Sequence, residues 1–133
     1  MFFMKQITQE WIDKGEGDFA TAQRELQVQQ KPNYDAVCFH SQQCAEKYLK
    51  AYLQEANITF NRIHDLSRLL DLILPVEPDW EALRPKLEAL TAYAVEFRYP
   101  GISANKDLAT QSFEDCVKIR NTILQNFSDS SVG

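Results

Sequence analysis

The clearest pattern along the chain lies between Tyr34 and about Ala56, where apolar residues recur at the spacing of a helix. Five of them share one face when each residue turns the helix by 100°: Val37, Cys44, Ala45, Tyr48 and Tyr52. A second, polar stripe follows steps of three and four residues: His40, Gln43, Lys47, Lys50 and Gln54. Because further apolar residues lie outside both stripes, this helix is expected to be central or to contribute to an oligomer interface.

The segment before it, from about Ile7 to Gln29, is also predicted to be helical. Its apolar residues lie near helical spacing: Ile7, Trp11, Phe19, Ala22 and Leu26. Gly15 and Gly17 weaken the pattern, because each costs about 1 kcal/mol relative to alanine inside a helix. A break follows this segment, after which Asn33 is expected to cap the next helix.

Two helices are predicted in the middle of the chain. The first follows His64 and Asp65, ends before Pro75 and carries four apolar residues: Leu66, Leu69, Leu70 and Ile73. Asp79 is expected to cap the second, which has a seam typical of bundles: Leu83, Leu87, Leu90, Ala94 and Phe97. That helix should end near Arg98 and Tyr99, because Pro100 disfavours helical geometry in the residue before it.

A fifth helix is predicted from about Lys106 to Phe127, with residues 128–133 as a frayed, polar tail. Only 4 glycines and 5 prolines occur in 133 residues, too few for an all-β fold with many turns. The pattern predicts an all-α, up-and-down antiparallel bundle of four to five helices. One domain is expected over residues 1–133, with its core at about 7–127.

Composition excludes several classes of function. The formal charge of −5 opposes a broad DNA- or RNA-binding surface, which must be basic. The 3 cysteines have no CxxC spacing and predict neither a disulfide framework nor a zinc site. No residues suggest a bound metal or cofactor. A secretory signal and a membrane span are both missing from the apolar pattern, so the expected location is the cytoplasm.

The polar stripe of the second helix is the first candidate site. His40, Gln43, Lys47 and Lys50 could present an imidazole, an amide and two ammonium groups to a phosphate or another anion. The alternative is a solvated helix face on which Glu46 and Lys50 form an ion pair one turn apart. Spacing by itself leaves both interpretations open.

Two short segments complete the candidate set. Arg98 and Tyr99 could offer a guanidinium and a ring to a bound nucleotide or partner, or Arg98 could simply complement the dipole of its helix. His64 could donate a hydrogen bond in a cleft between the second and third helices, with Asp65 beside it. Alternatively, one or both of these residues cap the third helix.

Three blocks of sequence resemble the HEPN domain family, the "higher eukaryotes and prokaryotes nucleotide-binding" domains. They are the run from Cys38 to Leu53, the triplet His64-Asp65-Leu66 and the triplet Arg98-Tyr99-Pro100. The match covers about Trp11 to Leu124. The resemblance implies a helical bundle that commonly dimerises through its long helices, and small prokaryotic members often encoded beside a minimal nucleotidyltransferase in toxin–antitoxin-like pairs.

Ribonucleases of this family are marked by an arginine that is followed, after four to six residues, by a histidine. Neither Arg98 nor Arg120 has a histidine at those positions; Arg120 is followed by Asn121 and reaches Gln125, Asn126 and Phe127 instead. Amide side chains bind phosphate but do not transfer protons near pH 7. Enzymatic activity is therefore not expected, and no catalytic residue is assigned.

The resulting hypothesis is a non-catalytic module that binds a nucleotide or a protein partner, acting as a homodimer with a small nucleotidyltransferase. Its expected contact residues are Gln43, Lys47, Lys50, His64, Asp65, Arg98 and Tyr99. One alternative is a divergent ribonuclease toxin with a site around Arg120, Asn121 and Asn126. A further alternative is a purely structural interaction domain.

Overall fold

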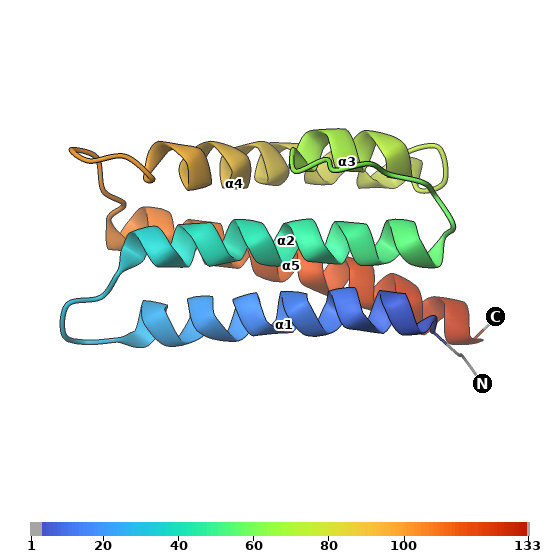
Figure 1. Cartoon of the computed structure of the whole chain (residues 1–133), viewed down its shortest axis with the longest axis horizontal. Helices are drawn as coiled ribbons and strands as arrows, with labels where there is room; N and C mark the ends of the chain where they lie inside the picture. The colour runs from blue at the N-terminus through green and yellow to red at the C-terminus, as the bar shows by residue number, and fades with distance from the viewer. Residues whose placement is uncertain (1–3, 133) are drawn as a thin grey trace.

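The computed structural model describes residues 4–132, and the side chains up to residue 129, as helices joined by short connections. Four long helices alternate in direction, α1 (Gln6–Gln27), α2 (Tyr34–Glu55), α4 (Arg84–Glu96) and α5 (Lys106–Val132), and the short α3 (Leu66–Ile73) lies beside α4 (Figure 1). The predicted all-α, up-and-down bundle is confirmed. Residues 1–3 and 133, which the predicted domain includes, lie outside the described residues.

The second helix, α2, is the centre of the bundle. It packs against α1, α3, α4 and α5, and Figure 1 shows α1 on one side of it and α4 on the other. All five residues of its predicted apolar face are buried, as are Leu49 and Leu53. Apolar residues around most of its circumference therefore reflect contacts with several helices of the same chain.

The predicted buried face of α1 is confirmed at Ala22, and Trp11, Phe19 and Leu26 pack against the core while partly exposed. Ile7 is 42% exposed, and the buried positions include four that were not predicted: Thr8, Ile12, Gly15 and Asp18. A Cβ on Gly15 would meet the ring of Tyr48 at 3.1 Å. The glycine that weakens the helix in isolation thus lets α1 approach α2 closely.

The start of the fourth helix also differs from the prediction. Residues Pro78–Leu83 form a 3₁₀ helix, η1, and α4 begins only at Arg84, with no side-chain cap. Asp79 lies in the first turn of η1 instead of capping α4. Pro85 explains the break, because it has no N–H to continue an α-helical ladder into the preceding turn. The predicted seam is confirmed at four positions, since Leu83, Leu87, Leu90 and Phe97 are buried.

The connection from α4 to α5 is a turn that includes Gly101, whose positive φ of 91° suits a residue without a Cβ. Asn105 then caps α5, because its side chain accepts a hydrogen bond from the backbone N–H of Leu108 at 2.8 Å. Helix α5 continues to Val132 where a tail is predicted, and no glycine or proline interrupts residues 128–132. Within residues 4–132, no helix combines the length and apolar character needed to cross a membrane.

Candidate functional site

A cleft of about 410 Å³ opens between α2, the α2–α3 connection and α4. We call it the α2–α4 cleft and define it by its lining residues: Phe39, Gln42, Gln43, Glu46, His64, Asp65, Thr91, Ala94, Val95 and Arg98. Four of these are predicted site residues that come from three separate parts of the sequence: Gln43, His64, Asp65 and Arg98. The fold thus brings most of the expected polar groups to one place.

The α2–α3 connection is held by Asp65. Its side chain caps α3, accepting hydrogen bonds from the backbone N–H groups of Ser67 at 2.9 Å and Arg68 at 3.4 Å. This capping role is one of the two interpretations that the sequence allows, and it fixes the backbone next to His64. The His64 side chain is 74% exposed, with Nδ1 2.9 Å from Glu46 Oε2.

Glu46 forms the floor of the α2–α4 cleft. Its side chain is 7% exposed, and its Oε2 accepts hydrogen bonds from Lys50 at 2.8 Å and His64 at 2.9 Å. Burial alone would raise the pKa of Glu46, but hydrogen bonds from His64, Lys50 and Gln42 hold it below its usual value. An ionised carboxylate can only accept hydrogen bonds. The Nδ1 atom of His64 therefore carries a proton, and the Nε2 atom faces solvent.

A chain of amides connects the floor to the wall of the cleft. Gln43 Nε2 donates to Gln42 Oε1 at 2.8 Å, and Gln42 Nε2 donates to Glu46 Oε1 at 3.2 Å. Gln42 itself is buried, whereas Gln43 is half-buried. The chain therefore holds the side chain of Gln43 at the opening of the cleft.

Arg98 and Tyr99 lie just beyond the end of α4, in the turn before Gly101. The backbone N–H of Arg98 donates to the carbonyl of Val95 at 3.3 Å. The exposed Arg98 side chain lines the cleft. Tyr99 is 64% exposed and does not line it.

The two predicted lysines lie outside the lining of the cleft. Lys47 binds Asp18 of α1 through an ion pair. Lys50 is 5% exposed, pairs with Glu46, and its Nζ lies 5.5 Å from the ring centre of Trp11. Each ammonium group is thus paired with a carboxylate, and neither lysine lines the cleft with Arg98. The Glu46–Lys50 pair exists, but it is buried instead of solvated.

Sequence reasoning missed four polar or aromatic residues of the cleft: Phe39, Gln42, Glu46 and Thr91. The sequence pattern places Glu46 only as an ion-pair partner on a solvated face. Its burial could have been predicted, because the apolar Leu49 and Leu53 lie three and seven residues after it on the same helix face. Thr91 gave no signal, since the predicted seam of α4 runs along Leu87, Leu90 and Ala94.

The alternative site around Arg120 has different surroundings. Arg120 Nε donates to Glu16 Oε1 at 2.7 Å, and the guanidinium lies 4.3 Å from the ring centre of Phe19. Hydrogen bonding to Glu16 raises the pKa of Arg120. Asn121 and Asn126 line a neighbouring hollow of about 450 Å³, together with Trp80, Lys118, Thr122, Gln125 and Asp129. None of these lining residues is a histidine or a cysteine.

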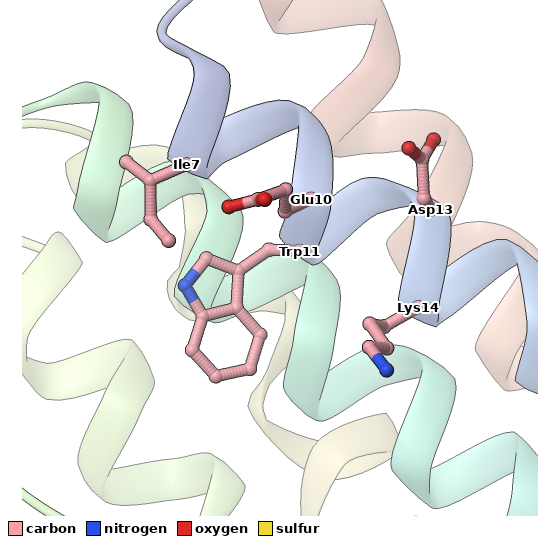
Figure 2. Close-up of a pocket in the computed structure, with 5 residues that line it drawn as sticks. All are labelled: Ile7, Glu10, Trp11, Asp13 and Lys14. Atoms are coloured by element: carbon pink, nitrogen blue, oxygen red, sulfur yellow. The ribbon is translucent and has the colours of Figure 1, made fainter.

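The largest hollow among those described, about 580 Å³, lies on α1. Figure 2 shows its lining side chains, with Ile7 and Trp11 on one side of the helix and Asp13 on another. Trp11 also packs at 6.3 Å between ring centres against Phe60. This groove offers apolar contact, in contrast to the polar α2–α4 cleft. Among the described residues, no group of three or more His, Cys, Asp or Glu side chains could hold a metal ion.

Known proteins share this sequence pattern and architecture. The HEPN domain family matches residues 8–127. A protein of Methanocaldococcus jannaschii named "Putative toxin MJ1304" is 30% identical over 131 residues, covering 90% of this chain and 84% of its own. The crystal structure of ST0689, an archaeal HEPN homologue, has a TM-score of 0.66 at 24% identity over 93% of this chain and 99% of its own. The chain therefore belongs to the HEPN domain family.

Proposed function

We propose that this chain is a non-catalytic HEPN module that binds a nucleotide in the α2–α4 cleft. The observation that carries the proposal is the convergence of Gln43, His64 and Arg98 around the buried Glu46. The cleft, at about 410 Å³, falls in the size range of pockets for small ligands. Its walls combine apolar side chains with a few polar groups, the usual composition of such sites.

The phosphate end of the nucleotide binds at the opening of the cleft. Arg98 supplies a planar guanidinium that donates two parallel hydrogen bonds to phosphate oxygens. His64 lies nearby with its Nδ1 held by Glu46 at 2.9 Å, and its Nε2 donates to phosphate in the imidazolium form, in which both ring nitrogens carry protons. The buried carboxylate is already neutralised by Lys50, so it does not repel an anion at the rim as an unpaired charge would.

We propose no catalysis because the hollow beside Arg120 has no histidine among its lining residues to transfer protons. Cleavage of RNA without a metal ion needs a base for the 2′-hydroxyl and an acid for the leaving oxygen. Arg120 donates to Glu16, and the residues of the neighbouring hollow that follow it on α5 are amides, a hydroxyl and an acid. The chain has 2 histidines, and the side chains of both contact carboxylates away from this hollow.

The test of nucleotide binding is calorimetric titration with ATP, GTP, AMP and GMP. Arg98→Ala should weaken binding at least tenfold, since a charge-assisted bond to phosphate is lost. Arg24→Ala is the matched control, because this exposed arginine lies in the last turn of α1, outside the cleft. Absence of heat with all four nucleotides at about 100 µM protein contradicts the nucleotide function.

We also propose that the module acts as a homodimer that pairs with a small nucleotidyltransferase. What supports a protein contact is the apolar groove of α1, where Ile7 is 42% exposed beside Trp11. Sedimentation equilibrium should give twice the mass of one chain, and the nucleotidyltransferase should co-purify. Ile7→Glu should weaken at least one of these associations, whereas Glu10→Gln in the same groove should weaken neither.

A divergent ribonuclease toxin is the second candidate, supported by the name of the M. jannaschii relative and by the hollow next to Arg120. It predicts growth arrest upon expression and RNA cleavage that is lost in Arg120→Ala. Intact RNA and harmless expression exclude it. If nucleotides and partners also fail to bind, the chain is a purely structural domain.

A further inference from the structure

The floor of the α2–α4 cleft is the carboxylate of Glu46, which can accept one more hydrogen bond than it receives from the described residues. An ionised carboxylate has about four acceptor positions. Lys50 and His64 occupy Oε2 of Glu46 at 2.8 and 2.9 Å, and Gln42 occupies one position of Oε1 at 3.2 Å. One position on Oε1 therefore remains, and it suits an N–H or O–H group of a ligand.

The amide chain adds a second acceptor. Gln43 uses Nε2 to donate to Gln42 at 2.8 Å, and Gln42 in turn donates to Glu46. Both bonds run toward the carboxylate and fix the orientation of the two amides, and each Nε2 keeps a second N–H group. The carbonyl oxygen of Gln43 receives no hydrogen bond from the described residues and remains available at the cleft.

A third polar atom of the lining lacks a partner. Thr91 Oγ1 is buried without a hydrogen-bond partner among the described residues, on the α4 side of the cleft. Buried hydroxyls are normally paired. The polar groups in and beside the cleft thus leave hydrogen-bonding capacity unused, including one acceptor position on Glu46 and the carbonyl oxygen of Gln43.

The walls beside these acceptors are apolar. Phe39 is 42% exposed and Val95 is 50% exposed, and Ala94 lies next to Val95 on α4. Such walls suit a flat heterocycle more than a hydroxylated sugar, since aromatic side chains stack on bases of any kind. A donor is placed at the rim, where the Arg98 guanidinium faces solvent.

We propose that the cleft selects nucleotides whose base carries an exocyclic amine, adenine or cytosine. The amine has two N–H groups, which donate to Glu46 Oε1 and to the carbonyl oxygen of Gln43, while the phosphate binds Arg98 at the rim. This selectivity rests on the proposed nucleotide binding. A base with a carbonyl at the same position places an acceptor against two acceptors and leaves them unpaired.

The experiment compares nucleotides that differ at the base alone. Calorimetric titration of the full chain uses AMP against IMP and CMP against UMP, which share ribose and phosphate. We expect AMP and CMP to bind at least tenfold more tightly than their partners. In Gln43→Ala this preference should fall severalfold, whereas Gln54→Ala, the same residue type on the same helix outside the cleft, should retain it.

The outcomes separate this inference from the proposed function. Equal affinity for AMP and IMP overturns base selection while nucleotide binding stands. A preference that is undiminished in Gln43→Ala overturns it as well, and so does binding that depends on the ribose, measured as loss with 2′,3′-dideoxy-AMP but not with IMP. If none of the four nucleotides binds, both the proposed nucleotide function and this inference fail.

Discussion

Two carboxylates of the bundle are bound in the same way, each by one histidine and one lysine. Glu46 accepts from His64 Nδ1 at 2.9 Å and pairs with Lys50. Asp18 lies 2.8 Å from His40 Nδ1 and pairs with Lys47. We call these the Glu46 cluster and the Asp18 cluster. Between them they use both histidines of the chain.

The clusters differ in where the exposed group lies. In the Glu46 cluster the lysine is buried, with 6% of its side chain exposed, and the histidine is 74% exposed. In the Asp18 cluster the two partners are similar, at 24% for Lys47 and 29% for His40. The first cluster therefore forms the floor of a cleft, whereas the second joins α1 to α2. The same donor set binds a carboxylate that lines the candidate site in one place and joins two helices in the other.

The largest expected effect separates the two lysines. Lys50→Ala removes the lysine that neutralises the buried Glu46 and leaves this carboxylate with hydrogen bonds from His64 and Gln42, which should lower the free energy of unfolding by about 3 kcal/mol. Lys47→Ala removes a partly exposed charge and should cost about 1 kcal/mol. Urea denaturation of both variants measures the difference. Equal losses contradict the assignment of different burial to the two pairs.

The next effect concerns the carboxylate that joins the helices. Asp18→Asn keeps the shape of the side chain but removes the charge that two partners share, and should cost about 1–2 kcal/mol. Asp13→Asn is the control, because Asp13 is exposed on the same helix. Thermal unfolding gives the comparison. If the two variants have equal stability, the Asp18 cluster does not stabilise the α1–α2 contact.

A smaller effect tests the close approach of α1 to α2, which the Asp18 cluster requires. Gly15→Ala places a Cβ 3.1 Å from the ring of Tyr48, which is fully buried, and should destabilise the fold by about 1 kcal/mol. Gly17→Ala meets nothing within 4 Å and should stabilise by about 0.5–1 kcal/mol through helix propensity. Chemical denaturation distinguishes the two signs. Stabilisation by both substitutions means that α1 can shift away from α2 without loss of stability, which contradicts tight packing at Gly15.

The smallest effect is a pH dependence of the Glu46 cluster. Because the pKa of Glu46 is held below its unfolded value, its ionised form stabilises the fold above about pH 4, and this contribution disappears as the pH falls further. The stability difference between the wild-type protein and Glu46→Gln should therefore stay constant from about pH 6 to pH 5 and shrink as the pH falls from about pH 5 to pH 3. Urea midpoints across that range provide the measurement. A difference that stays constant over the whole range contradicts this role of Glu46.

Much of the architecture could be predicted because α2 and α4 carry strong periodic patterns. The stripe through Val37, Tyr48 and Tyr52 places α2 in the core whatever its neighbours are. The buried face of α1 could not be found in this way. Three of its members, Thr8, Gly15 and Asp18, are not apolar, and each is buried against a specific partner on α2.

The candidate site shows the same limit. Local signals predicted that Gln43, His64 and Arg98 carry suitable groups, and the fold brings them together. They did not predict the ion pair of Lys47, because the carboxylate that binds it comes from another helix. The Glu46–Lys50 pair lies on one helix and is one of the two interpretations that the sequence allows. A charged residue found in the sequence is available to bind a ligand only where the fold does not pair it with an opposite charge.

The ammonium group of Lys50, 5.5 Å from the ring centre of Trp11, connects the floor of the cleft to one of 2 indole rings in the chain. Trp80, the other, packs against Tyr52 at 4.9 Å between ring centres. A nearby cation shifts the energy of indole emission through its electric field. Protonation of Glu46, or a ligand that hydrogen-bonds to it, weakens the ion pair that holds the Lys50 ammonium group and so changes the electric field at Trp11. The fluorescence of Trp11, on α1, is therefore a means to detect protonation or ligand binding at Glu46, in the cleft between α2 and α4.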